Sequence, residues 1–138
     1  MIDLHSPIQI LIRQIHGILR SPLQSIPSDS KPFIDQAFGL LKLEPVDSEE
    51  TIRNRSELAY TLSSLLSATL DSSFFSYGLN ILFQLGEVGE MLATAHLFQG
   101  QMPIETVVAQ LSSYAPSLQL VVLNRFFLDP RGADPQYL

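Results

Sequence analysis

Apolar residues recur along the chain at the spacing of an amphipathic helix, beginning after Ser6-Pro7. The pattern occupies positions i, i+3, i+4, i+7, i+10 and i+11, which form one face of a 3.6-residue helix. These positions are Ile8, Leu11, Ile12, Ile15, Ile18 and Leu19. A capping hydroxyl followed by proline is a helix start signal, so the pattern predicts a helix from Pro7 to about Arg20. Its interior Gly17 costs on the order of 1 kcal/mol relative to alanine, which we interpret as close packing of a neighbour.

A proline- and serine-rich segment separates this helix from the next. Residues Ser21–Ser30 are predicted to form a loop. A second helix is expected to begin at Lys31 and to end at Leu43, because the residue before Pro45 avoids the helical region.

The acidic run after Pro45 predicts the start of a third helix. Asp47-Ser48-Glu49-Glu50 has the form of a capping box, in which the Asp47 carboxylate accepts from the amide three residues on. Glu50 then reaches back to Asp47, and the acids suit the positive end of the helix. The third helix is expected to run to about Leu70, with a possible break near residues 54–56.

The stretch Asp71–Gly100 is the one around which the predicted fold is organised. Asp71 is a start signal and Gly100 is a stop signal. Two adjacent apolar stripes between them make a wide apolar face, as expected of a helix touched from more than one side. Gly86 and Gly89 favour a kink or a break. We therefore expect a central helix, or a kinked pair of helices, over residues 71–100.

Two more helices and a tail complete the predicted architecture. One helix is expected from Pro103, and Leu118–Leu128 is expected to be helical because no partner strand is evident. Residues 129–138 contain prolines and a glycine and are expected to form an extended tail. The sequence thus predicts an all-α, single-domain bundle of five to six helices over residues 1–128, without an internal repeat.

The composition indicates a protein that contacts other proteins. The chain is 46% hydrophobic and 16% charged, against roughly 25% charged in ordinary soluble domains. Part of its apolar surface is therefore expected to meet a partner or a second copy, and a homodimer is predicted. The chain has no cysteine and no signal-peptide pattern at its start, which favours a cytoplasmic protein. The longest uncharged run, Thr106–Asn124, is too polar for a membrane span.

The distribution of charge disfavours nucleic acid as a partner. The net charge is −6, and no lysine or arginine occurs between Ser56 and Asn124. Phosphate binding needs clustered cations, which are missing from this half of the chain.

Candidate catalytic and metal-binding residues are sparse. His5, His16 and His96 lie far apart without a second ligand type at metal-binding spacing, so no metal site is predicted. No nucleophile elbow or glycine-rich phosphate loop occurs, so neither an enzyme nor a cofactor is expected. Glu87 and Glu90 stand three residues apart on one predicted helix and can share a face. The candidate partner-binding residues are Glu87, Glu90, Phe126, Phe127 and Tyr137.

One short motif points to chemistry. Ala95-His96-Leu97-Phe98-Gln99-Gly100 resembles the core motif of histidine phosphotransfer domains, which are small helical bundles. The resemblance covers six residues and implies His96 as the phosphoacceptor. The lysine that follows the histidine by three residues in that family is Gln99 here, so the cation that would hold the phosphoryl group is missing. From the apolar stripe alone, His96 is expected to be a hydrogen-bonded core histidine.

The function expected from these features is non-enzymatic. We predict a small helical adaptor, regulator or assembly factor that acts by protein–protein interaction. One alternative is a phosphotransfer-like signalling module that uses His96. Another alternative is an acidic inhibitor or immunity-type protein that covers a basic enzyme surface, with binding that weakens steeply as salt is added.

Overall fold

The part of the chain described by the computed structural model, residues 7–19, 27–45, 47–99 and 102–128, contains helices and no strand. It forms seven α-helices and two 3-10 helices. They are α1 (Pro7–Leu19), η1 (Pro27–Ser30), α2 (Lys31–Lys42), α3 (Glu49–Ala68), α4 (Ser72–Phe83), α5 (Gly86–Gln99), α6 (Ile104–Val108), η2 (Leu111–Ser113) and α7 (Pro116–Leu128). The all-α class is confirmed. The predicted tail, residues 129–138, lies outside the described residues.

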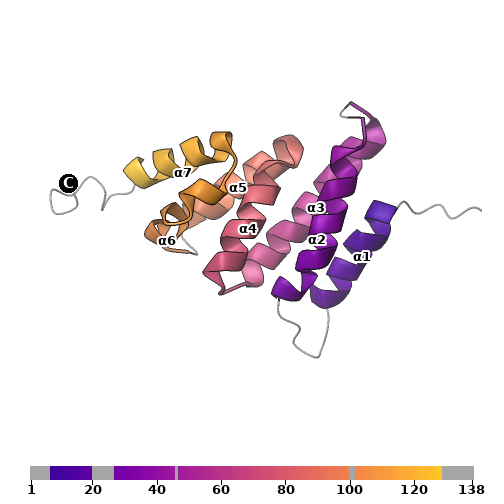
Figure 1. The fold of residues 1–138 in the computed structure, drawn as a ribbon, viewed down its shortest axis with the longest axis horizontal. Helices are drawn as coiled ribbons and strands as arrows, with labels where there is room; N and C mark the ends of the chain where they lie inside the picture. Colours follow the sequence, from indigo (N-terminus) through magenta and orange to yellow (C-terminus); the bar gives the residue numbers. More distant parts are fainter. Residues whose placement is uncertain (1–6, 20–26, 46, 100–101, 129–138) are drawn as a thin grey trace, which may run out of the picture.

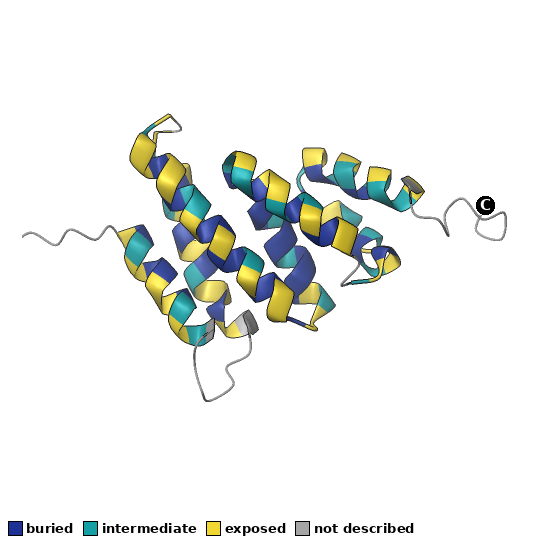
Figure 2. Cartoon of the chain, turned by 180° about the vertical axis from the view of Figure 1, so that it is seen from behind, coloured by how far each residue is buried: buried dark blue, intermediate teal, exposed yellow. Residues whose placement is uncertain are grey.

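The helices follow one another along the longest axis of the molecule, from α1 at one end to α6 and α7 at the other (Figure 1). Successive odd-numbered helices pack together, α1 against α3, α3 against α5 and α5 against α7, and α4 packs against α6. Seen from behind, these odd-numbered helices lie next to one another in chain order. Their exposed residues lie on the outer side and their buried residues on the inner side (Figure 2). The chain therefore alternates between two layers of helices.

Neighbouring helices of the odd-numbered layer run parallel. Gln9 and His16 of α1 contact Asn54 and Thr61 of α3, so both contacts join residues 45 positions apart. On the other side of α3, Ser63 contacts His96 of α5, a separation of 33 positions. Parallel neighbours need a return element between them, and α2 and α4 supply it.

The central stretch is a pair of helices, which raises the expected five to six helices to seven. The Asp71 carboxylate caps α4 by accepting from the amides of Ser73 (2.9 Å) and Phe74 (3.4 Å), as predicted. The helix ends at Phe83, and Gly86 opens α5 with a φ of +85°. That left-handed conformation favours glycine. At Gly89 a Cβ would lie 2.1 Å from the Leu82 carbonyl oxygen, so the two helices meet too closely for a larger residue.

The predicted capping box at the start of α3 is wrong. The N-cap is Ser48, one residue later than expected, and it makes no side-chain cap hydrogen bond. The reason is a turn in which the Ser48 amide donates to the Pro45 carbonyl, so Asp47 belongs to the connection and not to the helix. The Thr51 hydroxyl donates to the Glu44 carboxylate at 2.9 Å and ties the connection to the first turn. The helix then continues unbroken to Ala68.

The interpretation of Gly17 as a close-packed glycine is also wrong. Among the described residues, a Cβ at this position would meet nothing within 4 Å apart from its chain neighbours and its own helix backbone, and Gly17 is exposed. Gly17 therefore destabilises α1 relative to alanine, and no packing contact compensates for this loss.

One core runs through both layers. It joins the apolar stripe of α1, the inner face of α3, both faces of α4 and the inner face of α7. Its fully buried large side chains include Ile8, Ile15, Ile34, Leu41, Leu58, Leu62, Leu65, Leu66, Phe75, Leu79, Leu82 and Leu85. The core face of α3 and its C-cap include Leu58, Leu62, Leu65, Leu66 and Thr69, all of which are buried.

Tyr114 attaches the C-terminal helices to this core. Its buried hydroxyl donates to the Val107 carbonyl oxygen at 2.9 Å and lies 2.9 Å from the Ser76 hydroxyl of α4. Next to it, the Ala115 amide donates to the Asn80 side-chain oxygen at 2.9 Å. Burial raises the pKa of the Tyr114 hydroxyl, which keeps it a donor.

Candidate functional site

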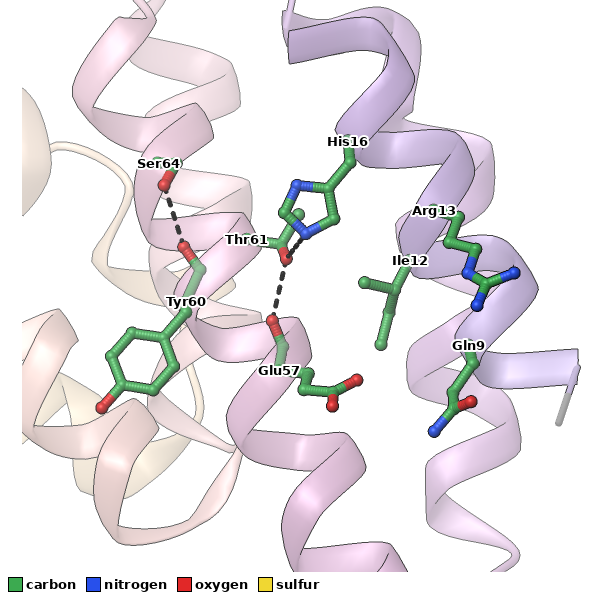
Figure 3. A pocket seen from close by; sticks show the side chains of 8 residues that line it. All are labelled: Gln9, Ile12, Arg13, His16, Glu57, Tyr60, Thr61 and Ser64. Carbon is green, nitrogen blue, oxygen red and sulfur yellow. Dashed lines mark hydrogen bonds between the residues drawn. The ribbon is translucent and has the colours of Figure 1, made fainter. Parts of the chain in front are cut away.

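A groove of about 410 Å³, lined mainly by polar and charged residue types, lies between α1 and α3 on the outer side of the layer. Each helix contributes four residues at the spacing i, i+3, i+4 and i+7, which is one helical face. They are Gln9, Ile12, Arg13 and His16 from α1, and Glu57, Tyr60, Thr61 and Ser64 from α3 (Figure 3). The His16 imidazole reaches across toward α3, whereas the Tyr60 ring points away from α1.

The hydrogen bonds in this groove fix the direction of proton donation. The Thr61 hydroxyl donates to the Glu57 carbonyl oxygen at 2.8 Å. Its single hydrogen is then used, so the contact of 3.0 Å with His16 Nε2 is one in which the imidazole donates. A histidine that donates to a hydroxyl cannot take a proton from it. The His16–Thr61 pair is therefore a helix-to-helix hydrogen bond and does not make Thr61 a nucleophile.

His96 lies in the interior, between α3 and α5. Its side chain is 4% exposed, its Nε2 is 2.7 Å from the Ser63 hydroxyl oxygen, and the Phe75 ring meets it edge-on. The other ring nitrogen, Nδ1, is buried and has no hydrogen-bond partner among the described residues. This is the environment expected of a hydrogen-bonded core histidine.

The surroundings of His96 weigh against the phosphotransfer alternative. Burial lowers the pKa of the imidazole, and the hydrogen bond with Ser63 offsets part of this effect. A phosphoacceptor must present a ring nitrogen to the donor protein, but Nδ1 is enclosed and Nε2 faces Ser63. The motif residue Gln99 is exposed, so the histidine and the lysine position do not face one surface.

A second groove, of about 430 Å³, lies between the first turns of α3 and α5. It is lined by Ile52, Arg55, Ser56, Leu85, Glu87 and Val88. Sequence inspection identified Glu87 and Glu90 but found no basic residue near them. The fold brings Arg55 into the same groove as Glu87, across a separation in sequence of more than 30 residues. Glu90 is exposed one turn further along α5.

Of the other predicted partner-binding residues, Phe127 lies on the outer side of α7. Phe127 is 70% exposed, whereas Phe126 is half-buried and packs against the core. The Arg125 guanidinium lies 5.1 Å from the centre of the Phe98 ring and joins α7 to α5. The predicted residue Tyr137 lies outside the described residues.

The described part of the chain contains no group of three or more histidine, cysteine, aspartate or glutamate side chains that could hold a metal ion. None of the described helices has both the length and the apolar character needed to cross a membrane. Comparisons of the chain with protein-family models, curated proteins and solved structures find no match.

Proposed function

We propose that this protein is a non-enzymatic helical module that works by binding other proteins, as an adaptor, a regulator or an assembly factor. The observation that carries the proposal is the outer side of α7. Leu120 and Phe127 stand seven residues apart, on one helical face, and are 71% and 70% exposed. The inner face of the same helix is buried through Leu118 and Val122. A helix that is apolar on both sides is typically covered on both sides.

A second copy of the chain is the partner that we propose for this surface. The net charge of −6 makes two copies repel each other over most of their surface. Residues Pro116–Leu128 contain no acidic residue, so α7 is a place where two acidic molecules can meet. A two-fold contact of α7 with α7 would bury the same side chains on both subunits. A cytoplasmic location belongs to the same proposal and is supported by the absence of cysteine, which fits a reducing compartment.

Sedimentation velocity at micromolar concentration tests the dimer. The wild type is expected to sediment as a dimer and the double variant Leu120→Glu/Phe127→Glu as a monomer with unchanged helical circular dichroism. The matched control is Leu43→Glu/Leu70→Glu, which places the same charges on exposed leucines outside the helices. The control is expected to remain a dimer. A strictly monomeric wild type would contradict the second copy as partner.

A photo-reactive phenylalanine analogue at position 127 tests the broader proposal in cells that make the protein. Illumination is expected to give a covalent adduct with a defined protein, whereas the same analogue at the exposed residue Gln36 of α2 is expected to give none. If position 127 gives no adduct, or both positions give the same adducts, α7 is not a binding surface and the module proposal loses its support.

A further inference from the structure

The groove between α3 and α5 has an apolar floor and acidic side chains along its α5 side, which we call the acidic wall. Leu85, 2% exposed, lies at its base, and Ile52, 53% exposed, stands at its edge. Val88 completes the apolar lining. A hollow of about 430 Å³ between two parallel helices can receive a large apolar side chain from outside.

The charged residues on the α5 side of this groove are all acidic. Glu87 lines it, Glu90 follows one turn later, and the chain has no lysine or arginine from Ser56 to Asn124 to balance them. On the other side, Glu49 and Glu50 are exposed in the first turn of α3, and Arg55 is the one cation among the lining residues. No hydrogen bond or ion pair engages the side chains of Glu87, Glu90 or Arg55 among the described residues. The charged groups at the groove are thus available to a partner.

We propose that this groove binds an amphipathic helix of a partner protein, with an apolar side chain over Leu85 and lysine or arginine residues facing Glu87 and Glu90. A helix fits better than an extended peptide, because the backbone of both walls is engaged in helical hydrogen bonds and recognition must come from side chains. The apolar contact supplies affinity, and the acidic wall selects a basic partner and excludes an acidic one. This site is separate from the outer side of α7, so the two surfaces can be occupied independently.

Selection from a random library identifies the preferred partner without assuming it. Helical peptides of about 14 residues, or four turns, are displayed on phage and selected on the full-length protein. Peptides that also bind Ile52→Glu, which places a charge over the apolar floor, are removed. The expected product is a set of sequences that combine an apolar stripe with lysine or arginine on one side of it. Enrichment of acidic or neutral sequences, or no enrichment that depends on Ile52, overturns the proposal.

Charge reversal then tests the role of the acidic wall. The selected peptide is expected to bind Glu87→Lys/Glu90→Lys at least about tenfold more weakly than the wild type, because the close contacts between opposite charges are replaced by contacts between like charges. The double variant Asp29→Lys/Glu105→Lys changes the net charge by the same amount at residues outside the groove lining, so it is the matched control. It is expected to alter binding by less than about threefold. Equal losses in the two proteins would mean that the peptide senses overall charge and would overturn the site.

Nuclear magnetic resonance locates the peptide. Amide signals of Ile52, Ser56 and Val88 are expected to shift on titration, whereas those of Leu120 and Phe127 are expected to stay unchanged. Shifts confined to α7 would overturn the groove as the binding site. If Ile52→Glu instead dissociates a dimer of the wild type, the occupant is a second copy and the basic-helix proposal is wrong.

Discussion

The hydroxyl oxygen of Ser63 on α3 lies 2.7 Å from Nε2 of His96 on α5, and this contact joins two parallel helices inside the core. This contact satisfies only one ring nitrogen, because Nδ1 is buried and has no hydrogen-bond partner in the described part of the chain. A proton added to His96 would place a positive charge, and an N–H group without an acceptor, between α3 and α5. The interface between these helices is therefore built around a neutral imidazole.

Acid is expected to destabilise the fold through His96. The folded state lowers the pKa of the imidazole from its ordinary value of 6.5. The unfolded chain then binds a proton at a higher pH than the folded chain does, so stability is full above about pH 6.5 and falls as the pH drops through that value. Urea unfolding of the wild type from about pH 8 to about pH 5 measures this fall.

The matched pair for this experiment is His96→Gln and His16→Gln. His96→Gln is expected to be less stable than the wild type at neutral pH but to lose little further stability on acidification. His16 is half-exposed, so His16→Gln should retain the acid-dependent loss. An identical pH profile for wild type and His96→Gln would show that other groups cause the acid sensitivity.

Two glycine-to-alanine changes are expected to have opposite signs. At Gly89 the new methyl group would lie 2.1 Å from the Leu82 carbonyl oxygen and 2.9 Å from the Leu85 Cβ, so backbone must move. Gly89→Ala is expected to lower the free energy of unfolding by about 1–3 kcal/mol. Gly17→Ala meets open space and is expected to raise it by about 0.5–1 kcal/mol. Chemical denaturation of both variants tests the pair, and a stabilising Gly89→Ala would contradict the close approach of α4 and α5.

Helix caps offer a second matched comparison. Asp71→Ala removes the carboxylate that accepts from two amides of α4 and is expected to cost about 0.5–2 kcal/mol in the free energy of unfolding. Ser48→Ala and Asp47→Ala change residues at the start of α3 where no side-chain cap hydrogen bond forms, so each is expected to cost less than about 0.5 kcal/mol. A large effect of Asp47→Ala would instead support a capping box there.

Removal of one buried hydroxyl is expected to loosen the C-terminal helices. Tyr114→Phe leaves the Val107 carbonyl oxygen and the Ser76 hydroxyl without this partner and is expected to cost about 1–3 kcal/mol. Tyr60→Phe is the control, because that ring is exposed and its hydroxyl has no partner among the described residues. Thermal unfolding followed by circular dichroism should therefore show a lower midpoint for Tyr114→Phe alone.

The sequence predicts those features that depend on neighbouring residues. Asp71 caps α4 because the residues it serves follow it within three positions, and the break at Gly86 follows from glycine's conformational freedom. The capping box at Asp47 was wrong for a reason of the same local kind, since a turn from Pro45 competes for the start of the helix. Local sequence signals therefore indicate the region in which a helix begins or ends more reliably than they indicate the terminal residue.

The grooves could not be predicted, because they depend on which helices lie side by side. The residues of the α1–α3 groove come together only when a helix between them returns the chain, so that His16 meets Thr61. The same holds for Arg55 and Glu87, which no pattern within a single helix connects. For His96 the apolar stripe indicated a core position, but Ser63 as its partner required the parallel register of α3 and α5.

The alternation of helices between two layers has a consequence for how the protein opens. α1 and α7 lie at opposite ends of the array, and each is held mainly by the helices next to it (Figure 1). In such a quasi-one-dimensional arrangement the interior units are supported on two sides and the terminal units on one. Backbone amides of α3 and α4 are therefore expected to exchange with deuterium at the rate of global unfolding, while α7 exchanges earlier through fraying of its end of the array. The outer side of α7, which we assign to partner binding, thus also lies at the end of the cooperatively folded array. A protein bound there would supply the packing neighbour that α7 lacks.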